Sequence, residues 1–199
     1  MVRTRSLFAC FMLAMLTAAP ALAGNKPWGF QMWAATTYVA PLSETDQNVS
    51  GVNAAIKASN EMGYQFGVEF RSGAIGLALD YLHARHNIQR SNAGLLGAAD
   101  FNPISGTLAL HLPLPLLELS AGPTVSYVNW GDLDLTNGSK QTIDAKLGYG
   151  ISVGADLPLG RSLAVTGGMR WLKIKAEPNG STAVEVDPLI TRIGMALRF

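Results

Sequence analysis

The sequence predicts an all-β fold, an eight-stranded antiparallel up-and-down transmembrane β-barrel that is preceded by a cleavable signal peptide. Three observations lead to this prediction. The amino terminus has the layout of an export signal, eight segments alternate between apolar and polar or small residues, and their connections are alternately long and short. A period of two places successive side chains on opposite faces of a strand, so each segment has one face suited to lipid and one suited to a polar interior.

The amino-terminal segment, residues 1–23, is the predicted signal peptide. Two arginines precede a short apolar run, and the segment ends in the small-residue sequence Ala21-Leu22-Ala23. This three-part layout is typical of a secretory signal, with cleavage expected after Ala23. No later stretch offers the roughly 20 consecutive apolar residues that a transmembrane helix needs. The expected mature chain, residues 24–199, is therefore one barrel domain.

Composition excludes several classes of function. Without the signal, 13 basic residues face 14 acidic ones and the only cysteine, Cys10, is lost. We therefore expect no nucleic-acid partner and no thiol or disulfide chemistry, and nothing in the sequence indicates a cofactor. A chain that is 48% hydrophobic yet has no long apolar run fits a barrel whose apolar residues occupy alternate positions.

The alternation is clearest in residues 62–71, where Met62, Tyr64, Phe66, Val68 and Phe70 stand opposite small or polar residues. It recurs along the chain, and we expect a local bulge or irregular pairing at Pro123 because proline cannot donate to a strand ladder. In the sixth segment we expect Ile143 to face lipid and Asp144 to face the interior. The eight predicted strands are 28–40, 62–71, 75–86, 103–112, 116–130, 142–157, 163–175 and 184–199.

The connections and the aromatic residues give two further tests. If the first strand runs outward, the long connections 41–61, 87–102, 131–141 and 176–185 all lie outside, and the short turns lie in the periplasm. In this orientation aromatic side chains gather at both membrane interfaces. The outer group is Tyr38, Tyr64, Tyr81, Tyr127 and Trp171, and the periplasmic group is Trp28, Phe30, Phe70 and Phe199.

The last strand ends in an aromatic residue and resembles the closing strand of bacterial outer-membrane barrels. In those proteins the terminal residues form the signal read by the barrel-assembly machinery, which implies that role for Phe199, Leu197, Met195 and Ile193. The alternative for this segment alone is an edge strand of a soluble sandwich.

The whole mature chain resembles the small eight-stranded outer-membrane barrels that include OmpA-like, OmpX-like and OmpW-like proteins. Val186-Asp187-Pro188, followed by Gly194 and Phe199, is similar to the closing strand of the OmpW family, although Leu197 replaces the usual aromatic residue. This narrower resemblance implies a barrel with an apolar interior passage for small hydrophobic compounds.

Charged residues are predicted on the inner face. Eight strands enclose a space that side chains largely fill, and buried charges must be paired, so we expect an ion-pair network near mid-barrel. It would be either a structural plug or the gate of a channel. Its predicted members are Glu69, Asp80, Glu118, Asp144, Lys146, Arg170 and Arg192, with Arg198 nearer the end of the chain.

Towards the outer end the inner face becomes apolar. The predicted cup would accept a hydrophobic solute and release it sideways into the membrane. Its alternatives are a slipped facing after a bulge, or strand extensions packed under the outer loops. The cup residues are Trp33, Val39, Leu82, Val128, Trp130, Leu172 and Ile174.

The sequence does not predict an enzyme or a metal site. His83 and His86 are three apart, so they point to opposite faces of a strand, and we expect both to be solvated near the outer loops. His111 faces inward near the periplasmic end, but no motif provides a nucleophile with its base.

The leading functional hypothesis is therefore an outer-membrane barrel that gives passage to small hydrophobic molecules. The alternative is a structural or surface-interaction barrel whose outer loops bind partners. In either case we expect a monomer in contact with outer-membrane lipid and lipopolysaccharide.

Overall fold

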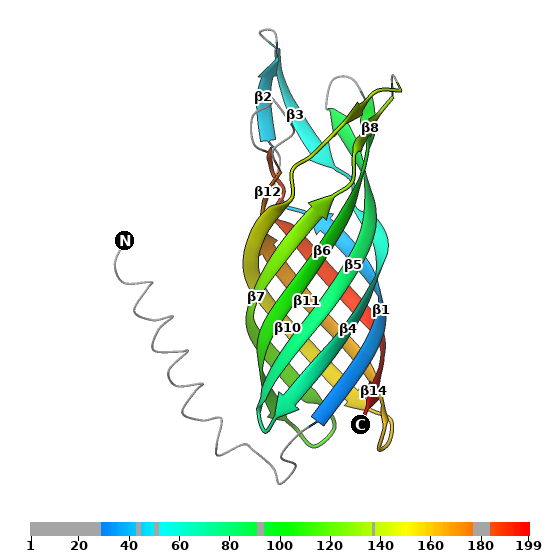
Figure 1. Cartoon of the computed structure of the whole chain (residues 1–199), viewed down its shortest axis with the longest axis vertical. Helices are drawn as coiled ribbons and strands as arrows, with labels where there is room; N and C mark the ends of the chain where they lie inside the picture. Colours follow the sequence, from blue (N-terminus) through cyan, green and yellow to red (C-terminus); the bar gives the residue numbers. More distant parts are fainter. Residues whose placement is uncertain (1–28, 43–44, 50–51, 91–93, 137, 177–183) are drawn as a thin grey trace, which may run out of the picture.

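The computed structural model describes residues 29–42, 45–49, 52–90, 94–136, 138–176 and 184–199. The predicted signal peptide and Trp28 lie outside these residues. The described part forms a closed cylinder of tilted strands, with β1 beginning and the chain ending at the same rim (Figure 1). Within these residues, no helix is long and apolar enough to cross a membrane.

Eight long antiparallel strands make the wall. Each pairs with the next barrel strand along the chain, and the last pairs with the first, so the predicted eight-stranded up-and-down barrel is confirmed. The strands are β1 (Gly29–Pro41), β4 (Glu61–Ser72), β5 (Ile75–Arg90), β6 (Gly94–Pro113), β7 (Glu118–Trp130), β10 (Lys146–Pro158), β11 (Leu163–Lys173) and β14 (Pro188–Arg198).

Six short strands lie in the long connections at the upper rim in Figure 1. Strand β3 pairs with the end of β5, and β8 pairs with the start of β6, so the wall continues beyond the barrel itself. The predicted loop 87–102 is consequently wrong in its bounds, because β5 and β6 extend through most of it. The short strands are β2 (Thr45–Val49), β3 (Val52–Ala58), β8 (Leu133–Leu135), β9 (Lys140–Gln141), β12 (Lys175–Ala176) and β13 (Val184–Glu185).

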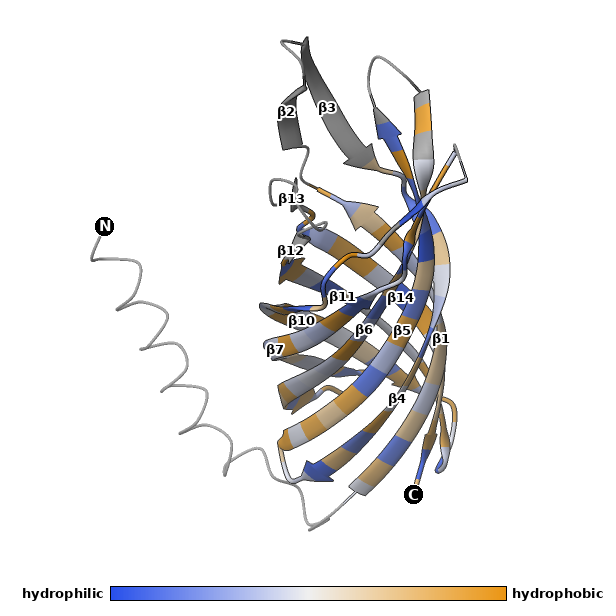
Figure 2. Ribbon diagram, turned by 45° about the horizontal axis from the view of Figure 1, so that its top comes forward, coloured by the Kyte–Doolittle hydropathy of each residue, from blue (hydrophilic) through white to orange (hydrophobic). Residues whose placement is uncertain are grey.

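The predicted facing of the strands is confirmed along most of the wall. In β1, Met32, Ala34, Thr36 and Tyr38 are exposed, whereas the residues between them are buried. Apolar and polar positions alternate along the ribbons in Figure 2. Because large apolar side chains stay exposed on one face of every barrel strand, the outer surface is suited to hydrocarbon and unsuited to water.

Aromatic side chains mark both ends of this apolar surface. At the periplasmic end the ring of Phe30 lies 4.9 Å from that of Phe70 and 5.9 Å from that of Phe199. The five aromatic residues expected at the outer interface are all exposed on the outer face of the wall. Rings of this kind are enriched where a membrane meets water.

The predicted facing of one segment is wrong. Residues 142–145 precede β10, so Ile143 turns inward and is buried, while Asp144 is exposed. The irregular pairing expected at Pro123 is confirmed, without a bulge: the β6–β7 ladder skips two residue pairs but resumes in the same register, from Thr107↔Thr124 to Leu110↔Ala121. The register shift lies instead in the β5–β6 pair, between Ile88 and Gln89. A proline that lacks one donor has therefore interrupted pairing without adding a residue to the strand.

Asp187, just before β14, has a positive φ of 34°. Aspartate tolerates this conformation better than most residues because its side chain can accept a local hydrogen bond. Here Oδ1 accepts from the backbone N–H of Ile174, at 3.2 Å. The contact ties the end of β11 to the start of the closing strand.

Candidate functional site in the barrel interior

The outer third of the interior is filled by an apolar cluster. Side chains from β1, β5, β6, β7, β11 and β14 meet here. We call this group of side chains the outer apolar cluster. It unites six of the seven predicted cup residues, and its members are Val39, Leu82, Ala84, Ala99, Phe101, Val128, Trp130, Ile143, Leu172, Ile174 and Ile190.

The outer apolar cluster is packed and does not form an open cup. Val39, Leu82, Val128 and Leu172 have no surface that a water molecule can reach. An eight-stranded barrel is just wide enough for its inward side chains to fill it, which explains why the expected hollow is closed. A solute could enter this region only if apolar side chains moved aside.

Trp33 lies below the cluster, packed with Ala35, Ala164 and Ala196. A Cβ added at Gly67 would collide with the Trp33 indole, so the ring needs a glycine on the neighbouring strand. The guanidinium carbon of Arg192 lies 4.0 Å from the ring centroid, a cation–π contact. Trp33 therefore belongs to the middle of the barrel and not to the cup.

The middle of the barrel is crossed by a buried ion pair. Arg170 Nη2 lies 2.6 Å from Asp80 Oδ2, and Nη1 lies 2.8 Å from Oδ1, a bidentate geometry. Gln65 donates a further hydrogen bond to Asp80, at 2.6 Å. Because Asp80 is on β5 and Arg170 is on β11, the pair spans the lumen and closes the axial path at this level.

Hydroxyl groups continue this polar layer around the wall. Arg170 Nε donates to Ser152 Oγ at 2.9 Å, Ser152 bonds Thr124 at 2.7 Å, and Thr124 bonds Thr107 at 2.8 Å. The chain links β11, β10, β7 and β6 by side-chain hydrogen bonds. We call these residues, with Gln65 and Asp80, the polar belt.

A second charged cluster lies near the periplasmic end, centred on His111. Its Nδ1 is 2.7 Å from Glu118 Oε1, and its Nε2 is 2.7 Å from Glu69 Oε1 in a close but poorly aligned contact. Arg71 pairs with both glutamates. The imidazole therefore lies between two carboxylates, hydrogen-bonded to Glu118 and in contact with Glu69.

A third group of polar residues extends this cluster towards the rim. Arg198 Nη2 lies 2.8 Å from Asp156 Oδ2, and its Nε donates to Gln31 Oε1 at 3.0 Å. Gln31 in turn donates to Asp156, at 3.0 Å. Ion pairs thus occupy two levels of the lumen, whereas we expected one network near mid-barrel.

The predicted charge network is therefore only partly brought together. Glu69, Asp80, Glu118 and Arg170 form ion pairs, and Arg192 stacks on Trp33. Asp144 is exposed above the barrel, and Lys146 pairs across strands with Val128, at the level of the outer apolar cluster.

Sequence reasoning assigned no role to His111, Arg71 and Asp156. The short turn between β6 and β7 could have indicated that His111 lies near Glu118. It places Pro113 opposite Glu118 and His111 opposite Ser120, so His111 and Glu118 are diagonal neighbours on one face of the two strands. His83 and His86 do point to opposite faces, but His86 is buried, with Nδ1 2.8 Å from the Ser59 carbonyl oxygen. Its expected solvation was wrong because β5 continues past it.

The wall has a gap in its ladder beside the outer apolar cluster. Strands β5 and β6 pair at Tyr81↔Ile104 and again at Ala84↔Phe101, but the two positions between them are unpaired. One of these contains Pro103, which has no N–H to donate. Opposite Pro103 is Leu82, a member of the cluster. We call this interruption the lateral gap.

Side chains partly bridge the lateral gap on the outer face. Asn102 Oδ1 accepts from Tyr81 Oη at 3.2 Å and from His83 Nδ1 at 2.6 Å. These side-chain hydrogen bonds replace part of the missing backbone pairing. The described residues contain no group of three or more histidine, cysteine or acidic residues that could hold a metal ion.

The closed barrel, its apolar outer face and its aromatic ends define a bacterial outer-membrane β-barrel protein. Comparison with solved structures agrees with this class. The outer membrane protein OprG from Pseudomonas aeruginosa is similar with a TM-score of 0.77 and 17% identity, covering 88% of this chain and 98% of that one. No protein-family model and no curated protein matches the chain.

Two further structures extend the comparison. The outer membrane protein AlkL, studied in DMPC lipid bilayers, has a TM-score of 0.64 and 25% identity, covering 89% of this chain and 92% of its own. The outer membrane protein W from E. coli has a TM-score of 0.56 and 17% identity, covering 88% and 100%. The predicted resemblance to small eight-stranded outer-membrane barrels is thus confirmed at the level of the fold.

Proposed function

We propose that this protein gives small hydrophobic molecules a path from the outer end of the barrel sideways into the membrane. The observation that carries the proposal is the position of the lateral gap. The wall lacks backbone pairing directly in front of Leu82, one of the residues of the outer apolar cluster. An apolar interior therefore lies behind one of the two places where the ladder of the wall is interrupted.

The polar belt favours this sideways route over an axial one. Below the outer apolar cluster, a solute moving along the axis meets the Asp80–Arg170 pair, which is buried and bidentate. Separating buried charges leaves each of them without its partner, at a cost of several kcal/mol. An apolar solute offers no hydrogen bond to replace that contact. Leaving through the wall avoids this cost.

Entry into the cluster is compatible with its packing. Its side chains are apolar, so a hydrocarbon that displaces them exchanges one dispersion contact for another. Burial out of water contributes roughly 0.8 kcal/mol for each methylene of the solute. At the lateral gap the hydrogen bond that a Pro103 N–H would donate is already missing, so one hydrogen bond fewer has to break for the strands to separate.

The test restores the missing backbone donor. In liposomes containing the purified protein, Pro103→Ala gives β6 an N–H with which to pair to β5, and uptake of a fluorescent alkyl solute should fall several-fold. Pro123→Ala is the matched control, because it repairs the interruption between β6 and β7 and should leave uptake unchanged. Equal uptake by the wild type and the Pro103→Ala variant would rule out the gap as the exit.

A second candidate is a structural or surface-interaction barrel. The observation that favours it is the closed interior, in which apolar packing and two charged levels leave no continuous path among the described residues. The strands that extend beyond the barrel rim would then present the partner-binding surface. Solute uptake no faster than in protein-free liposomes would favour this function over the first.

A further inference from the structure

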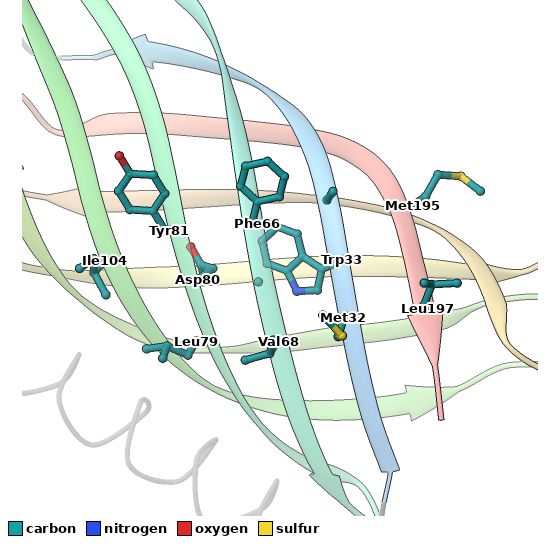
Figure 3. A pocket seen from close by; sticks show the side chains of 12 residues that line it. Met32, Trp33, Phe66, Val68, Leu79, Asp80, Tyr81, Ile104, Met195 and Leu197 are labelled. Carbon is teal, nitrogen blue, oxygen red and sulfur yellow. The ribbon is translucent and has the colours of Figure 1, made fainter.

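An apolar groove crosses the lipid-facing side of the barrel over β14, β1, β4, β5 and β6. Its volume is about 620 Å³, and carbon and sulfur atoms make up nearly all of its surface. Figure 3 shows its lining side chains, which include Met32, Phe66, Leu79, Tyr81 and Met195. The groove lies outside the barrel, so the passage proposed above does not by itself account for it.

The strand register explains the shape of the groove. Its two sides are neighbouring rows of outward side chains, and its floor is the inward-facing row between them, which contains Trp33, Gly67 and Asp80. Each row crosses five strands in the direction of the hydrogen bonds. The row nearer the outer rim is Met195, Ala34, Phe66, Tyr81 and Ile104, and the other is Leu197, Met32, Val68, Leu79 and Gly106.

Small residues leave the groove open. Ala34 interrupts the outer row, and a Cβ added at Gly106 would have no heavy atom within 4 Å. Four steps between strands, each about 4.8 Å, give a length of about 19 Å. This length suits the extended alkyl chain of a medium-sized molecule.

The groove begins at the lateral gap. Tyr81 and Ile104, which line its end on β5 and β6, form the last backbone pair before the interruption. Next to them lies the Tyr81–Asn102–His83 group, whose hydrogen bonds are on the outer face of the wall. The groove therefore has hydrogen-bonding side chains at one end and an apolar surface leading away from them.

We propose that this groove is a binding site for the solute after it leaves the barrel. The solute is an unbranched, medium-chain amphiphile such as an alkanol, with its chain between the two rows and its hydroxyl at Tyr81, Asn102 and His83. This inference rests on the proposed function. It adds a substrate class and a surface along which the solute moves away from the gap.

The direction of the groove favours a solute over the acyl chain of a membrane lipid. Strands of such barrels are tilted by about 40°, so a groove along their hydrogen bonds runs at about 50° to the membrane normal. Lipid chains lie along the normal on average, and their headgroups are held at the interface. A free amphiphile has no such constraint.

Photolabelling in lipid nanodiscs tests the site, with a decanol that carries a diazirine near the end of its chain. Labelling should concentrate on the groove residues of β1, β4 and β5, and unlabelled decanol should compete. Ala34→Phe fills the groove and should reduce labelling by about tenfold or more, because each methylene kept from burial costs about fourfold in affinity. Gly106→Leu, at the end near the gap, should also reduce it.

The matched control is Ala155→Phe, which adds the same ring to an exposed outward position on β10. It should leave labelling of the groove unchanged. Labelling spread evenly around the barrel, or an equal effect of Ala34→Phe and Ala155→Phe, would overturn the site. Competition by a phospholipid as effective as that by decanol would assign the groove to membrane lipid and would also overturn it.

The two proposals fail in different ways. If the lateral gap is not the exit, Pro103→Ala leaves uptake unchanged while specific labelling of the groove persists. If the groove is not a site, labelling is unspecific even where Pro103→Ala abolishes uptake. Labelling of the wild type and all four variants is compared in nanodiscs, and uptake is compared in liposomes.

Discussion

At the scale of single residues, Asp80 and Arg170 decide how the interior is closed. Both side chains are almost completely buried, and their two parallel hydrogen bonds join opposite walls of the barrel. A buried ion pair adds little stability compared with an apolar pair of similar volume, but breaking it is costly because one charge is left unpaired. The pair thus favours one arrangement of the lumen more than it stabilises the fold.

We expect Arg170→Met to lower the free energy of unfolding by about 3–5 kcal/mol, because Asp80 loses its charged partner. The double variant Asp80→Leu with Arg170→Met should recover most of this loss. Urea titration of the refolded protein, followed by tryptophan fluorescence, measures both. Arg85→Met, which removes an exposed pair with Asp134, is the control and should have no measurable effect. A double variant as unstable as the single one would contradict this account.

At the scale of elements, the closing strand β14 combines two tasks. It pairs with both β1 and β11, so the barrel closes only when it is in register. Its outward residues Ile193, Met195 and Leu197 are exposed to lipid, as is the terminal Phe199. These four residues formed the predicted assembly signal, and we propose that role for them.

Phe199→Ala should lower the amount of folded protein in the outer membrane several-fold, because the barrel-assembly machinery would lose the terminal ring. Membrane fractionation and the mobility of unheated samples in gel electrophoresis measure the folded fraction. Leu116→Ala is the control, since it removes an exposed apolar side chain at a periplasmic turn outside β14. Equal folded amounts of the two variants would refute the assembly role.

At the scale of the whole molecule, the wall is asymmetric along its axis. One rim has three short turns, and the other carries β2, β3, β8, β9, β12 and β13 (Figure 1). At the outer rim, Asp134 lies between Arg85 and Lys140. Its hydrogen bond with Lys140 lowers the pKa of the Asp134 carboxyl below its ordinary value. An ionised, strongly polar rim of this kind belongs in water, beyond the edge of the bilayer. Barrels of this type place their longer loops outside, so we expect this rim to face outward.

Cysteine labelling in intact cells tests the orientation. The mature chain is expected to have no cysteine, so a single one can be introduced at Thr136 in the β8–β9 connection or at Ser162 in the β10–β11 turn. A maleimide that does not cross membranes should label Thr136→Cys in intact cells. It should label Ser162→Cys only after the outer membrane is permeabilised. The reverse pattern would show that the barrel is inserted the other way round.

Much of the fold could be predicted because facing is a local property. In β4, each residue's neighbours along the chain already indicate which side it faces, and the structure agrees. The prediction failed where the strand itself ended. Ile143 and Asp144 continue the alternation in sequence but precede β10, so their facing follows the path of a connection. At Pro123 the missing donor was evident, but whether it shifts the register depends on the neighbouring strand.

By itself, the sequence determined that the chain forms eight paired strands with lipid on one side and a partly charged interior on the other. The period of two and the lengths of the turns are local features of the sequence, and they do not depend on residues far away in the chain. Only the tertiary structure decided that the outer apolar cluster is full, that His111 meets Glu69 and Glu118, and that an apolar groove ends at Tyr81 and Ile104. These features depend on how closed strands are staggered, which sets the residues that meet across the lumen and along the hydrogen-bonded rows.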